Sequence, residues 1–116
     1  MKELSEREGL TRAHLVTHSF CGVDSRAALS LFGASAHVRS LTTVCSPHLG
    51  MRLIDNCSRH PERCPIEMAE KAFEAVGLSQ RNAQEFTTDN MADFNLACED
   101  SSSVEYYSVG AHKAQL

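Results

Sequence analysis

The sequence lacks long apolar runs, and no stretch approaches the roughly 20 residues that a membrane-spanning helix needs. It also lacks a basic excess, because 11 lysines and arginines stand against 15 aspartates and glutamates, a formal net charge of −4. Nucleic acid is therefore not expected as a partner. The charged N-terminal residues 1–8 contain no apolar segment, so we expect no signal peptide. That favours the cytoplasm or an organelle without deciding the compartment.

The composition is that of an ordinary globular protein, with 42% hydrophobic and 22% charged residues. A length of 116 residues predicts a single domain, residues 1–116. Repeats and low-complexity segments are absent from the sequence. All three prolines lie between residues 46 and 65, which predicts irregular structure there.

The five cysteines leave one unpaired in any disulfide scheme. Cys21 and Cys45 fall in apolar segments and are expected to be small buried residues. Cys57 and Cys64 flank a loop and would pair in a secreted protein, whereas two free thiols are the alternative. Together with His60 they suggest zinc, but no fourth ligand is evident at that spacing. We therefore expect no metal and no cofactor.

Apolar periodicity predicts an α/β fold with about three parallel strands and flanking helices. The predicted strands are 13–18, 38–45 and 104–109. The predicted helices are 2–8, 22–32 (closed by Gly33), 49–56, 66–76, 79–86 and 89–98. The first two strands and the helix between them form a βαβ unit. Its strands must therefore be parallel, with a right-handed crossover.

The junction between the first strand and its helix is the most informative stretch. The apolar pair Leu15-Val16 leads into Ser19, small residues bracket that serine, and the helical pattern begins at once. This is the layout of a nucleophile elbow, in which a sharp strand-to-helix turn exposes a serine on strained backbone. Small residues such as Gly22 are needed because the strand end and the first helical turn nearly touch.

Three blocks, in order, resemble the α/β-hydrolase lipases. The segment Thr17-His18-Ser19-Phe20-Cys21-Gly22-Val23-Asp24-Ser25-Arg26 is similar to their [G/A/T]-H-S-x-G-G-x-D-x-R block, with Cys21 where the family usually has glycine. Ser46-Pro47-His48-Leu49-Gly50 is similar to their T-P-H-x-G segment. Residues 86–95 and 106–111 resemble their lid-to-strand segment. The resemblance covers most of the chain from about residue 10 and implies a partial α/β-hydrolase fold.

The resemblance also implies roles for individual residues. Ser19 would be the catalytic nucleophile, and the backbone N–H of Phe20 would be one oxyanion-hole donor. The remaining positions are expected to shape the elbow or its surroundings: Thr17, His18, Cys21, Gly22, Asp24, Arg26, Pro47, His48 and Gly50. The helix dipole favours Asp24 in the first turn, and Arg26 is expected to pair with a neighbouring carboxylate or carbonyl.

The implied function is hydrolysis of acylglycerols or similar apolar esters. We expect the general base and acid of the family to be missing from the chain, because no acid followed by a histidine comes after a later strand. His18, His48 and His112 are the histidines considered as a base, and none has the required setting. We therefore expect a truncated form of such a hydrolase. The alternative is a catalytically inactive fragment or pseudoenzyme that acts, if at all, through protein interaction.

The segment of about 47–103 is expected to be a helical insertion. In the lipases such an insertion forms the cap or lid, whose apolar face contacts a lipid surface transiently. The amphipathic helix 66–76 and the helix 89–98 suit that role. Ordinary packing against the sheet is an equally good explanation of their apolar faces.

Overall fold

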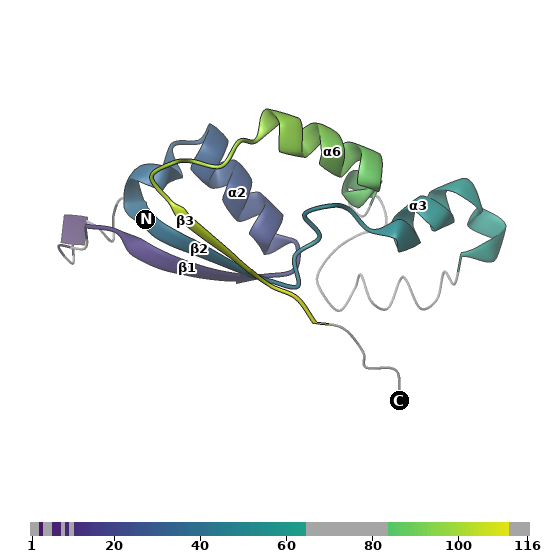
Figure 1. Ribbon diagram of the computed structural model, residues 1–116, viewed down its shortest axis with the longest axis horizontal. Coiled ribbons are helices and arrows are strands. Elements are labelled where there is room, and N and C mark those ends of the chain that lie inside the picture. The colour runs from purple at the N-terminus through teal and green to yellow at the C-terminus, as the bar shows by residue number, and fades with distance from the viewer. Residues whose placement is uncertain (1–2, 4–5, 8, 10, 65–83, 112–116) are drawn as a thin grey trace. The chain divides into compact units, whose positions relative to one another are not determined.

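The computed structural model describes residues 3, 6, 7, 9, 11–64 and 84–111 (Figure 1). The chain forms two compact units, one made of Met1–His48 and Cys98–Leu116 and the other of Leu49–Ala97. Within the described residues, no helix has both the length and the apolar character that crossing a membrane requires.

The first unit is built on a three-stranded sheet. Its strands are β1 (Ala13–His18), β2 (Val38–Val44) and β3 (Glu105–Val109), in that spatial order, and both neighbouring pairs are parallel. The three predicted strands are confirmed to within one residue at each end, as is their parallel arrangement. All three strands therefore present their carboxyl ends at the same edge of the sheet.

Helix α2 (Cys21–Leu31) carries the chain from β1 back to the start of β2 and lies along one face of the sheet (Figure 1). It confirms the helix predicted at 22–32. Gly33 follows the helix with a φ of 72°, a left-handed conformation that glycine adopts without steric cost. The short 3₁₀ helix η1 (Ala34–His37) then leads into β2.

The core of the first unit lies between α2 and the sheet. Leu29 of α2 and Leu41 of β2 are each 1% exposed or less. Full burial of a leucine side chain stabilises a fold by about 1.5–3 kcal/mol. Four buried residues form this cluster, with three partly buried residues packed against it: Leu29, Val38, Leu41 and Val104, then Leu15, Ala34 and Tyr106.

Arg12 ties together the amino ends of the three strands. Its guanidinium donates hydrogen bonds to the backbone carbonyls of Ser35, Val38 and Ser103. These carbonyls precede β2, begin β2 and precede β3. Sequence patterns do not indicate this role, because the three acceptors are backbone atoms and Arg12 stands outside the predicted strand.

In the described residues, the second unit contains α3 (Arg52–Arg59), the 3₁₀ helices η2 (Pro61–Arg63) and η3 (Gln84–Phe86), and α6 (Thr88–Ala97). The helix predicted at 89–98 is confirmed within one residue. The helix predicted at 49–56 is shifted: α3 begins at Arg52 because Met51 is still extended, with φ −125° and ψ 110°. The helix predicted at 66–76 lies outside the described residues, as do most of those at 2–8 and 79–86.

Asp55 of α3 caps the start of α6. Its carboxylate accepts two hydrogen bonds from Thr88, one from the backbone N–H and one from the hydroxyl, both 2.9 Å long. The bond from the N–H of Thr88 is the main reason that the pKa of Asp55 is lowered. This cap satisfies one of the amide groups that a helix leaves unpaired at its start.

Gly50 lies close against the same residue. Its φ is 81°, and a β-carbon there would stand 2.6 Å from the Cα of Thr88.

Cys57 and Cys64 form a disulfide at the end of α3. Of the two alternatives left open by the sequence, the structure therefore has the disulfide and not two free thiols. Their sulfur atoms are therefore not available as thiolate ligands for zinc.

Candidate active site

Ser19 lies at the junction between β1 and α2, in a strained conformation. It follows the last residue of β1 by one position and has a φ of 57°. Non-glycine residues rarely adopt this left-handed region, and strain of this kind concentrates at functional sites. The Ser19 N–H donates to the carbonyl of Val44 at 2.9 Å, and its own carbonyl accepts from Gly22 at 3.1 Å. The predicted strained strand-to-helix turn is confirmed.

Gly22 is the residue that allows α2 to start so close to the sheet. A β-carbon at this position would lie 2.1 Å from the Oγ of Ser46 and 3.0 Å from the Cγ2 of Thr43. Real β-carbons do not approach other atoms at 2.1 Å, so any side chain here would force the helix or the loop to move. Gly22 is therefore the position in the elbow at which a glycine is required.

Cys21 corrects an expectation. We expected its side chain to be buried between strand and helix, but it is exposed, and so is Cys45, which was also expected to be buried. The first turn of α2 is rotated so that Gly22 faces the sheet and Cys21 faces outward. The departure from the family pattern at Cys21 therefore meets no steric objection in this chain.

The start of α2 concentrates amide groups next to Ser19. Phe20 is the N-cap residue, and no side chain caps the helix there. The N–H groups of Val23 and Asp24 bond to the carbonyl of Phe20 at 2.9 and 3.2 Å. A helix N-terminus carries partial positive charge, which favours an anion nearby. The exposed Asp24 side chain lies in this first turn.

The segment after β2 repeats the geometry of the segment after β1. Cys45 has a φ of 50° and donates its N–H to the carbonyl of Val109 at 2.8 Å, as Ser19 does to Val44. These two are the non-glycine residues with positive φ among those described. A tight turn at Pro47 follows, in which the N–H of His48 bonds to the carbonyl of Ser46 at 2.9 Å.

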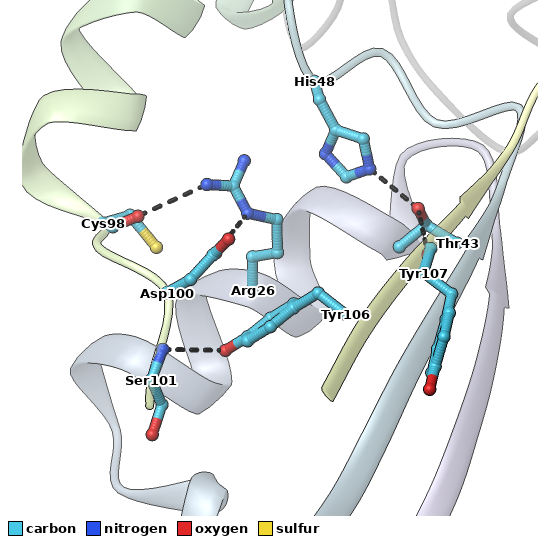
Figure 2. A network of polar contacts seen from close by, with 8 residues as sticks. All are labelled: Arg26, Thr43, His48, Cys98, Asp100, Ser101, Tyr106 and Tyr107. Carbon is cyan, nitrogen blue, oxygen red and sulfur yellow. Dashed lines mark hydrogen bonds and ion pairs between the residues drawn. The ribbon is translucent and has the colours of Figure 1, made fainter. Parts of the chain in front are cut away.

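His48 anchors this turn to the sheet through Thr43. The Nε2 of His48 lies 2.9 Å from the Thr43 hydroxyl, which also donates to the carbonyl of Tyr107 at 3.3 Å. Figure 2 shows Thr43 between the two. A hydroxyl has one proton to donate, and a carbonyl only accepts. His48 must therefore donate from Nε2, which places the neutral imidazole's lone pair on Nδ1.

The surroundings of His48 favour its neutral form. Burial lowers the pKa of His48 below its ordinary value of 6.5, and the positive charge of Arg26 lowers it further. The carboxylate of Asp100 acts in the opposite direction and does not reverse the effect. Desolvation and a nearby like charge both disfavour imidazolium.

Arg26 connects α2 to the segment that leads into β3. Its Nε lies 3.2 Å from the Asp100 carboxylate, and its guanidinium donates to the carbonyl of Cys98 at 3.4 Å (Figure 2). The expected pairing of Arg26 with a carboxylate or carbonyl is confirmed, with both kinds of partner. Nearby, the N–H of Ser101 donates to the Tyr106 hydroxyl at 3.0 Å.

Sequence reasoning missed Thr43, Asp100 and Tyr107 as members of this network. Thr43 had a usable signal, because it is a polar residue on the same face of a predicted strand as the apolar Leu41. Asp100 and the Tyr107 carbonyl had none, because each meets its partner across more than 60 residues of chain.

The elbow also holds hydroxyls with no hydrogen-bond partner in the described residues. The Oγ1 of Thr17 and the Oγ of Ser46 are both buried in this way. His18, by contrast, is exposed and pairs in register with Val44 of β2. The two residues that precede Ser19 therefore have side chains on opposite faces of the sheet, as strand alternation requires.

No side chain in the described part of the chain hydrogen-bonds to the Ser19 hydroxyl. His48 contacts Thr43, and His60 lies 3.5 Å from Glu62 in the second unit. His112 lies outside the described residues. Across residues 11–64 and 84–111, no three histidine, cysteine or acidic residues are grouped so as to hold a metal ion.

Comparison with known proteins gives one kind of match. The chain is similar to the solved structure of Bacillus licheniformis lipase BlEst2 in its mature form, with a TM-score of 0.71 and 22% sequence identity. The similarity covers 92% of this chain and 42% of that one, so the chain spans less than half of the lipase's length. No family model matches the chain, and no curated protein matches it.

At this level of identity the match establishes the fold and not the activity. The three parallel strands, the helix that follows the strained serine and the similarity to a lipase agree with one another. The chain has a partial α/β-hydrolase fold.

Proposed function

We propose that the chain carries the nucleophile segment of a lipase-like hydrolase that cleaves carboxylic esters with apolar acyl groups. The observation that carries this proposal is the conformation of Ser19. A serine with φ 57° stands between a parallel strand and a helix, beside a glycine that no side chain could replace without movement. Backbone strain of about 1–3 kcal/mol persists in proteins mainly where function requires it.

In this reaction the Ser19 Oγ attacks the carbonyl carbon of the ester. The C–O bond to the alcohol then breaks, the alcohol leaves with a proton, and an acyl group stays on Ser19. Water attacks this acyl-enzyme, releases the carboxylic acid and restores the hydroxyl. The amide of Phe20 is the proposed donor to the negative oxygen of each tetrahedral intermediate. The N-terminal end of α2 supports that charge.

A serine hydroxyl needs a general base to attack at a useful rate. His48 is held by Thr43 at Nε2, and the described histidines make no bond to Ser19. We therefore propose none of the described histidines as the general base.

The second unit supports an apolar substrate. Leu49 and Leu96 are each 81% exposed, and Leu53 is 44% exposed. Exposed leucines on a short helical unit are suited to transient contact with a lipid surface. A lid function for this unit is part of the proposal, and the amphipathic segment 66–76 belongs to it by sequence alone.

The alternative is a catalytically silent chain that acts through protein interaction. It is favoured by one observation, the absence of any hydrogen bond to the Ser19 hydroxyl among the described residues. The two functions differ in whether Ser19 is more reactive than an ordinary serine.

A fluorophosphonate probe, followed by mass mapping of the labelled peptides, separates the two. We expect a slowly formed adduct on Ser19, lost in Ser19→Ala and kept in Ser108→Ala, which removes an exposed serine from β3. An adduct spread over several serines, or none at all, would favour the silent alternative. Hydrolysis of p-nitrophenyl butyrate by the same samples tests turnover separately from labelling.

A further inference from the structure

A tripeptide in α3 has the sequence of an acceptor for N-linked glycosylation. Asn56-Cys57-Ser58 fits the pattern Asn-X-Ser/Thr, in which X is any residue except proline. The other asparagines, at positions 82, 90 and 95, are not followed two residues later by serine or threonine. So short a pattern also occurs by chance, and its assignment as a modification site therefore rests on its structural setting.

The acceptor side chain lies on the surface of α3. Asn56 and Ser58 are both exposed, whereas Ile54 is 4% exposed and is the buried residue of this helix. Successive residues of an α-helix are rotated by about 100°, so Asn56 projects about 200° away from Ile54. Within residues 11–64 and 84–111, the Asn56 side chain makes no hydrogen bond or ion pair. A bulky group on its amide nitrogen would therefore displace no packed contact there.

The middle residue of the tripeptide gives an independent indication. Cys57 is bonded to Cys64. Disulfides form and persist in oxidising compartments, of which the lumen of the endoplasmic reticulum is one. Acceptor tripeptides of this kind are modified in proteins that pass through that lumen. The composition of residues 1–8 leaves the compartment undecided, and the disulfide favours the one in which Asn56 would meet the transferase.

The folded tripeptide is a poor substrate for such an enzyme. Asn56 lies inside the helix, and its carbonyl accepts a hydrogen bond from the N–H of His60 at 2.8 Å. The next residue, Cys57, is fixed by the disulfide. A transferase has to enclose the asparagine amide and the hydroxyl two residues later, which the helix and the disulfide both restrict. Transfer must therefore come before the disulfide closes.

We propose that Asn56 carries an N-linked glycan, attached in the endoplasmic reticulum before Cys57 pairs with Cys64. In the transfer, the Nδ2 of Asn56 forms a bond to the anomeric carbon of a sugar carried by a lipid pyrophosphate. The bond from that carbon to the pyrophosphate oxygen breaks, the amide loses one proton, and the lipid pyrophosphate leaves. The Ser58 hydroxyl is the group by which the enzyme recognises the acceptor. None of these steps involves Ser19.

A glycan at this position has a consequence for the second unit. It is bulky and hydrated, so it keeps the Asn56 side of α3 in water. Leu53 lies one turn before Asn56 on the same side of the helix and would be partly shielded. Contact with a lipid surface would then depend on Leu49 and Leu96, each 81% exposed.

Cell-free translation of the full 116-residue chain behind a cleavable signal peptide, with and without microsomes of endoplasmic reticulum, tests the proposal. With microsomes, we expect one additional species of slower gel migration, which peptide N-glycosidase F converts back. Asn56→Gln and Ser58→Ala should each abolish this species. The matched controls are Ser58→Thr, which keeps the hydroxyl, and Asn90→Gln, which changes an asparagine outside the pattern, and both should retain it.

Conditions that keep Cys57 unpaired test the order of the two reactions. Dithiothreitol during translation and the variant Cys64→Ser should both increase the glycosylated fraction. Because transfer comes before folding, these measurements do not require the variants to fold. Absence of the slower species from both the parent and Cys64→Ser overturns the proposal, as does its persistence in Asn56→Gln. A glycosylated fraction that fails to rise when Cys57 is unpaired overturns the proposed order.

Discussion

At Gly22 the first turn of α2 passes so close to the loop after β2 that a methyl group has no room. We predict that Gly22→Ala lowers the free energy of unfolding by at least the roughly 1–3 kcal/mol typical of overpacking. Urea denaturation measures this loss. Gly110→Ala is the control, because a β-carbon at Gly110 meets no described atom within 4 Å. Equal stability of the two variants would contradict the close approach.

Ser19 and Cys45 both hold a side chain in the left-handed region, which costs about 1–2 kcal/mol at a non-glycine residue. We therefore predict that Ser19→Gly raises the melting temperature, whereas Ser19→Ala does not. Calorimetry of the two variants measures the difference, and Cys45→Gly should behave like Ser19→Gly. Destabilisation by Ser19→Gly would mean that the strain is absent in solution.

The elbow was predictable residue by residue only up to a point. A serine between an apolar run and a helical pattern indicates the turn, and the structure confirms it. The motif says nothing of how the helix is rotated about its own axis. That rotation decides that Gly22 faces Ser46 and that Cys21 faces outward, and it depends on packing against β2.

Among the elements, the start of α6 depends on one carboxylate. The Thr88 N–H lowers the pKa of Asp55 below its ordinary value of 3.8, so the cap is fully present above pH 3.8 and is lost as pH falls through the lower, folded-state value. We predict that the amide proton of Thr88 shifts in NMR spectra as this carboxyl titrates in strongly acidic solution. In Asp55→Asn that titration should vanish, and its persistence there would assign the effect to another acid.

The strands were predictable because the pattern of apolar residues that indicates a strand is local in the sequence, and β1, β2 and β3 form where that pattern occurs. The start of α3 was not, because Gly50 and Met51 are held out of helical geometry by contacts with Thr88 and Phe86, more than 30 residues away. The contacts of Arg26 with Asp100 and Cys98 have the same character. Sequence patterns predict elements well and the polar contacts between distant segments poorly.

For the molecule as a whole, His48 makes stability depend on pH near neutrality. Its pKa is lowered by burial and by Arg26, so the unfolded chain binds a proton more readily than the folded one. Stability is therefore full above pH 6.5 and declines as pH falls from there to the folded-state value, below which it levels off. Urea midpoints measured between about pH 8 and pH 5 should show the decline. A tenfold difference in proton affinity between the two states corresponds to about 1.4 kcal/mol, and we expect less because the ring is only partly buried.

The variant His48→Gln separates this effect from other titrations. Glutamine keeps a donor for the Thr43 hydroxyl and does not titrate, so the decline near pH 6.5 should shrink while the fold is kept. An unchanged pH profile in the variant would assign the decline to one of the other five histidines.

The contact of Arg12 with the Ser103 carbonyl joins segments 91 residues apart in the chain. Contacts that close so long a span form late in folding, because the entropy of closing the loop must be lost before the contact stabilises anything. The contacts of Arg12 should therefore slow unfolding and have little effect on the rate of folding. Stopped-flow measurements on Arg12→Met should show unfolding faster by roughly tenfold, for a loss of about 1.4 kcal/mol, and a folding rate close to that of the parent. The lifetime of the native sheet is in this sense set at the end of the strands that is farthest from Ser19.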